Sequence, residues 1–111
     1  MNNFVHDGNT LVIPAPREVQ NGEGVQVGAL FGIAATWAPK DQPVAIALRG
    51  VFEVKKDSNE FWPIGARLHW DDDKHLFRAD PASGAYVGVA VEETKLDAPG
   101  IGRVRLNGTA I

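Results

Sequence analysis

Short apolar runs separated by turn residues are the feature that most constrains the fold of this 111-residue chain. The sequence contains 12 glycines and 7 prolines. Many of them form turn signals, at Asp7-Gly8, Asn21-Gly22, Ala38-Pro39, Asp80-Pro81, Ser83-Gly84, Pro99-Gly100 and Asn107-Gly108. Between these signals lie runs rich in Val, Ile, Leu and Phe. This spacing is typical of an all-β sandwich or barrel, and the length is that of one small domain.

The clearest predicted strand is VAIALRGVFEV, residues 44–54. One face of it, at the two-residue period of a strand, carries Val44, Ile46, Leu48, Phe52 and Val54. We therefore expect that face, including Phe52, to lie in the core. Gly50 is in phase with the apolar face and indicates a bend, a bulge or a close approach of another backbone.

Other predicted elements are shorter. The remaining strands are expected over residues 10–13, 25–28, 30–36, 66–70, 75–79, 86–92 and 103–107. A single helical turn is expected over residues 56–62, ending before Pro63, because the residue before a proline is displaced from helical geometry.

The stretch ARLHWDDDKHLF, residues 66–77, places two histidines beside three consecutive aspartates. With a three-residue loop, His69 would face His75 and the pair would resemble a zinc or nickel site. With a loop of two or four residues, Trp70 would pair with His75 and Leu68 with Phe77, and the histidines would lie on opposite faces. Burial of an apolar face sets strand register, so we favour the even loop, with the aspartates as turn formers and no metal bound.

Composition and motifs argue against several functional classes. The chain has no cysteine and a net charge of −3, and no basic cluster indicates nucleic-acid binding. No signal peptide or membrane-spanning segment is expected. Neither Ser58 nor Ser83 lies in a nucleophile motif, and no glycine-rich segment continues into a phosphate-binding G-K-[ST] sequence. We therefore expect a protein that is not an enzyme and uses no cofactor.

Six segments follow one another over about residues 4–108: FVHDGNTLVIPAP, GEGVQVGALFGIAAT, VAIALRGVFEVKK, WPIGARLHWDDDKHLF, YVGVAVEE and GRVRLNG. Their order resembles the small capsid-cement, or head decoration, family of tailed phages and prophages. The resemblance implies a small β-rich fold on the outer surface of the head, made in the host cytoplasm. It also implies binding to the major capsid protein as a homotrimer at threefold or quasi-threefold positions, without catalytic residues. One of the two arginines in GRVRLNG exceeds the family pattern.

Large aromatic side chains are more numerous than a core of this size easily hides, and interfaces are enriched in them. The candidate interface residues are Phe4, Val5, Phe31, Trp37, Trp62 and Trp70. Residues 1–8 are expected to form a capsid-contacting arm, and residues 9–111 a single β-rich decoration domain. The alternative is that residues 3–6 form an edge strand of the protein's own sheet.

Two other functions stay open at this point. One is a small β-barrel binding module on the virion that recognises a carbohydrate or host ligand, with an exposed Trp37 or Trp62 as its stacking platform. The weaker one is a metal-dependent enzyme that uses His69, His75 and the aspartates.

Overall fold

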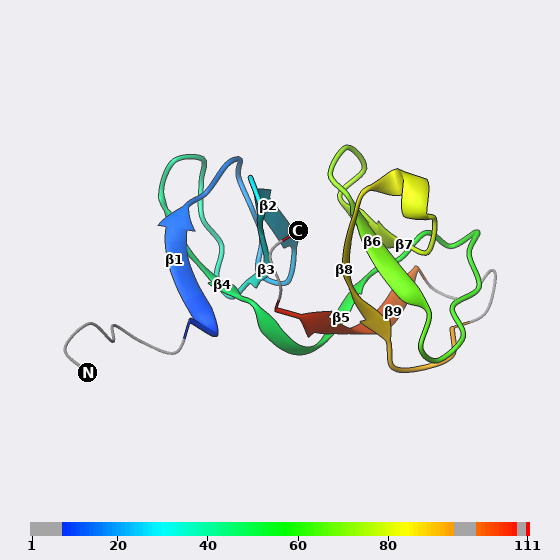
Figure 1. The fold of residues 1–111 in the computed structure, drawn as a ribbon. Helices are drawn as coiled ribbons and strands as arrows, with labels where there is room; N and C mark the ends of the chain where they lie inside the picture. The colour runs from blue at the N-terminus through cyan, green and yellow to red at the C-terminus, as the bar shows by residue number, and fades with distance from the viewer. Residues whose placement is uncertain (1–7, 95–99, 109–110) are drawn as a thin grey trace, which may run out of the picture.

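The computed structural model describes residues 8–94, 100–108 and 111, and over these residues the fold is all-β (Figure 1). A four-stranded antiparallel sheet has the order β1 (Thr10–Pro14), β4 (Pro43–Ala47), β3 (Leu30–Ala34), β2 (Gly24–Val27). A five-stranded antiparallel sheet has the order β5 (Arg49–Lys55), β9 (Ile101–Asn107), β8 (Ala85–Ala90), β6 (Arg67–Asp71), β7 (Leu76–Arg78). The two curled sheets lie side by side in Figure 1, and the expected all-β class is confirmed. No helix in the described ranges is long and apolar enough to cross a membrane.

The predicted strand over residues 44–54 is real but serves both sheets. It is interrupted at Leu48. Strand β4, before the interruption, belongs to the four-stranded sheet, and β5, after it, belongs to the five-stranded sheet. Gly50 lies within β5 and pairs in continuous register with Leu106, so no bulge is found there. Its φ of 127° lies in a region that side-chain-bearing residues rarely adopt, which explains the glycine. The alternating apolar residues of 44–54 therefore contribute to two different cores. Phe52, on the inward face, is only partly buried.

The helical turn predicted over residues 56–62 is wrong. Lys56 bridges Phe77, and the backbone N–H and C=O of Trp62 both bond with Thr94 at 2.8 Å. These bridges use backbone groups that a helix would need. Between them the chain forms only a turn, closed by the Glu60 N–H donating to the Asp57 carbonyl at 3.0 Å. The helical element in the described chain is instead the 3-10 helix η1 (Pro81–Ser83), where Asp80 caps the backbone N–H of Ala82 at 2.9 Å.

The protein has two apolar clusters, one associated with each sheet. The first is built on the four-stranded sheet and contains Ala15, Val19, Val25, Ala34, Ala38, Val44 and Ile46. The second lies within the five-stranded sheet and contains Val54, Trp62, Leu68, Trp70, Phe77, Val87, Ala90, Val104 and Leu106, together with Phe31 and Ile33 from β3.

Aromatic contacts connect β3 of the four-stranded sheet to β6 and β7 of the five-stranded sheet. The Phe31 ring lies 5.3 Å from that of Trp70 and 5.7 Å from that of Phe77, and Trp70 and Phe77 are themselves 5.3 Å apart. A Cβ atom on Gly24 would stand 2.6 Å from the Trp70 ring, so β2 can approach this indole only with glycine there. These contacts hold the two sheets against each other.

Candidate interaction surfaces

The turn between β6 and β7 has four residues, 72–75, so the expected even loop is confirmed. The predicted partners are wrong by two positions, because Trp70 pairs with Phe77 and Asp71 with Leu76. The reason is His75, which adopts a left-handed φ of 56° and closes the turn by donating its N–H to the Asp71 carbonyl at 2.8 Å.

The two histidines have separate environments. The register places His69 opposite Arg78, and its Nδ1 atom lies 3.0 Å from the Gly84 carbonyl oxygen. The His75 ring instead stacks on Trp70, with ring centres 6.2 Å apart. Within the described part of the chain, no group of three or more His, Cys, Asp or Glu side chains could hold a metal ion.

The aspartate run builds the turn, as predicted. Asp71 Oδ1 accepts the backbone N–H groups of Lys74 at 2.9 Å and Asp73 at 3.0 Å, and Asp72 accepts the Trp70 indole N–H at 2.9 Å. The hydrogen bond from Lys74 is the main cause that lowers the pKa of Asp71, against the opposing effect of burial. The first two aspartates therefore stabilise the hairpin.

A second group of charges surrounds Arg78. Its guanidinium lies 3.4 Å from Asp57, 3.4 Å from Asp71 and 3.8 Å from Glu60. Glu60 Oε1 also accepts the Trp62 indole N–H at 3.1 Å and the Ala79 N–H at 2.7 Å. This cluster ties the loop after β5 to β7 over the buried Trp62, which is a structural role.

The candidate interface residues occupy very different places. Phe31, Trp62 and Trp70 are buried within the chain, at 6%, 0% and 2% exposure. Trp62 is therefore not available as the stacking platform of a sugar-binding module. Trp37 is 54% exposed, with its indole nitrogen 3.4 Å from a carboxylate oxygen of Glu18.

Phe4 and Val5, and the arm to which they were assigned, lie outside the described residues except for Gly8. Sequence reasoning passed over several other exposed apolar side chains, namely Val12, Val51, Ile64 and Ile101. For Val51 the signal was present, since it falls on the outward face of the strand 44–54.

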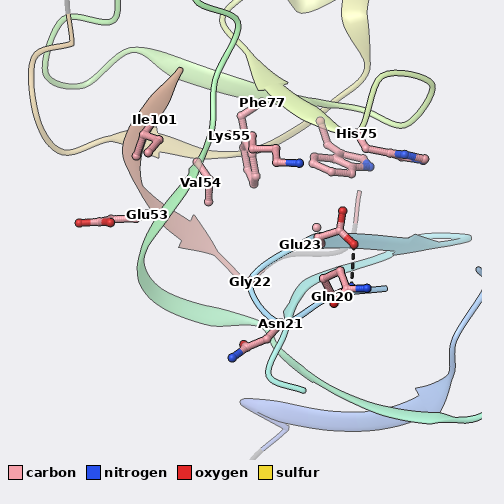
Figure 2. Close-up of a pocket in the computed structure, with 12 residues that line it drawn as sticks. Gln20, Asn21, Gly22, Glu23, Glu53, Val54, Lys55, His75, Phe77 and Ile101 are labelled. Atoms are coloured by element: carbon pink, nitrogen blue, oxygen red, sulfur yellow. Dashed lines mark hydrogen bonds between the residues drawn. The ribbon is translucent and has the colours of Figure 1, made fainter. Parts of the chain in front are cut away.

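A pocket of about 340 Å³ lies between the loop of residues 20–24 and the edge of the five-stranded sheet (Figure 2). Trp70 and Phe77 form part of its apolar lining, and the polar rim includes Glu53 and His75. Glu23 is committed to the loop itself, because its Oε1 atom accepts the Gln20 N–H at 2.7 Å. The pocket is lined by segments that are far apart in the chain, so no local sequence motif predicts it.

The chain belongs to the phage cement protein family, because the model of that family matches residues 5–106. This confirms the family resemblance noted in the sequence. Neither a comparison with curated proteins nor one with solved structures returns a match. Membership makes this a viral structural protein that associates with the phage capsid.

Proposed function

We propose that the protein binds the outer surface of the phage head and stabilises the assembled shell by contacting neighbouring copies of the major capsid protein. The family match over residues 5–106 is the observation that carries this proposal. The internal use of the polar clusters supports it, because the carboxylates around Arg78 and in the β6–β7 turn serve packing rather than chemistry.

The physical basis of cementing is linkage. A ligand that binds the assembled shell better than free subunits stabilises the shell, by about 2.7 kcal/mol per site when its free concentration is 100 times Kd. A shell carries many such sites and their free energies add, so the stabilisation from each single contact can be small. We further propose that the copies sit as trimers at threefold positions, where one copy can face each surrounding capsid subunit.

The contact is proposed to include the arm of residues 1–8. The segment MNNFVHDG carries Phe4 and Val5 among polar residues. An extended segment can add a strand to an exposed sheet edge, where backbone hydrogen bonds supply affinity and a side-chain pocket supplies register.

Purified undecorated capsids test both parts. The wild-type protein, added at a saturating concentration, should bind to these capsids and raise the temperature at which the shells disrupt. Deletion of residues 2–8 should leave the melting temperature of the free protein nearly unchanged and abolish binding.

Two results count against these proposals. If the wild-type protein does not bind the capsids, or binds without raising their disruption temperature, the cement function is wrong for this chain. If the truncated protein folds and decorates at full occupancy, the arm is not the contact, although the cement function stands.

A further inference from the structure

The outward side of the five-stranded sheet carries a row of four side chains, one from each of four adjacent strands. Val51 on β5 pairs with Arg105 on β9, Arg105 pairs with Val89 on β8, and Val89 pairs with Arg67 on β6. Directly paired residues share a sheet face, so apolar and cationic side chains alternate across it. We call these four residues the arginine row.

Three of the four side chains in the row are exposed, and Val89 is partly buried. Val51 is 57% exposed, and both Arg67 and Arg105 are exposed. The Arg67 guanidinium lies over the ring of Tyr86, 5.4 Å from its centre, and Tyr86 is itself 38% exposed. The ring restricts the arginine without neutralising its charge, so less side-chain freedom is lost when a partner binds.

The arginines of this sheet differ in their ion pairs. Arg103 bonds Glu53 at 3.1 Å and Glu92 at 3.2 Å, so its charge is compensated inside the protein. That pairing assigns a role to one arginine of the GRVRLNG segment. No carboxylate of the described residues lies within ion-pair distance of Arg67 or Arg105.

We propose that the arginine row is the docking face for an acidic patch on the outer surface of the major capsid protein. This inference rests on the proposed cement function and adds the face and the partner chemistry. An arginine fork binds carboxylates in bidentate geometry, and protein interfaces are enriched in arginine and aromatic residues. Val51 and Val89 provide apolar contact between the charges. A protein surface fits this alternation better than nucleic acid does, because phosphate binding requires several clustered cations and the chain is acidic overall.

Binding to purified undecorated capsids should be compared for wild type, Arg105→Glu, Arg67→Glu and Lys40→Glu. Lys40 is an exposed cation before β4, outside the row, and its variant makes the same change in net charge. We expect Arg105→Glu and Arg67→Glu each to weaken binding by about tenfold or more, with unchanged melting temperatures, while Lys40→Glu binds like wild type. Raising the ionic strength should weaken the wild type more than the Arg105→Glu variant.

The outcomes separate this inference from the function on which it rests. Wild type that fails to bind capsids overturns both. Capsid binding that is equal in wild type and both arginine variants overturns the docking face alone. A variant that keeps capsid affinity but loses self-association, or loses binding to double-stranded DNA, also overturns it, since the row would then belong to a second copy or to nucleic acid.

Discussion

Trp70→Ala should be the most damaging single truncation at the junction of the two sheets. The indole is 2% exposed, contacts the rings of Phe31 and Phe77, and donates its N–H to Asp72. Truncation of a buried tryptophan to alanine costs about 3–5 kcal/mol, because the transfer free energy is lost and a cavity is left. This is a large share of the roughly 5–15 kcal/mol by which a domain is stable.

The expected thermal shift follows from the chain length. Unfolding entropy of about 2.1 cal/mol/K per residue gives about 0.23 kcal/mol/K for 111 residues. The melting temperature should therefore fall by about 13–21 °C. Trp37→Ala is the matched control, since its side chain is 54% exposed and its loss should cost less than about 1 kcal/mol, or about 4 °C.

Thermal melts followed by circular dichroism, with urea unfolding as a second measure, would test this prediction. A Trp70→Ala shift below about 5 °C, or one equal to that of Trp37→Ala, would refute the idea that this indole joins the two cores. A large shift in both variants would instead indicate that Trp37 is buried in solution, against its described exposure.

Two further predictions concern the hairpin and the crossing strand. Because the pKa of Asp71 is lowered in the folded state, its carboxylate stabilises the fold above the ordinary aspartate pKa of about 3.9, and this contribution is lost as the pH falls through the lowered value. The difference in unfolding free energy between wild type and Asp71→Asn should therefore be largest at neutral pH and shrink in acid; a difference that is constant down to about pH 2 would contradict the assignment. Phe52→Ala should cost about 3 kcal/mol because Phe52 packs partly buried against the second core, whereas Val51→Thr on the exposed face should cost less than about 1 kcal/mol. Equal losses in urea unfolding would mean that the inward face of β5 is misassigned.

The candidate site was predictable only in part. The family resemblance indicated a capsid-associated protein, and the model of the phage cement family confirms the family. The count of aromatic residues suggested interface anchors, but it could not distinguish Trp37 from Trp62. Their exposures differ because Trp62 forms a bridge with Thr94, which is distant from it in the chain, and this long-range pairing cannot be read from the local sequence.

The sequence by itself determined the all-β class, the unusual backbone conformation at Gly50 and the even length of the turn after Asp71. Each depends on local properties: two-residue alternation, glycine's access to positive φ, and aspartate's bonds to nearby backbone N–H groups.

Only the tertiary structure decided that the strand over residues 44–54 is divided between two sheets, and that Trp70 packs against Phe31 between them. It also decided that Val51, Arg105, Val89 and Arg67 stand in one row. The reason is cross-strand register, which joins residues far apart in the chain through the closing of long loops and the burial of a shared core, so no local pattern encodes which residues become neighbours.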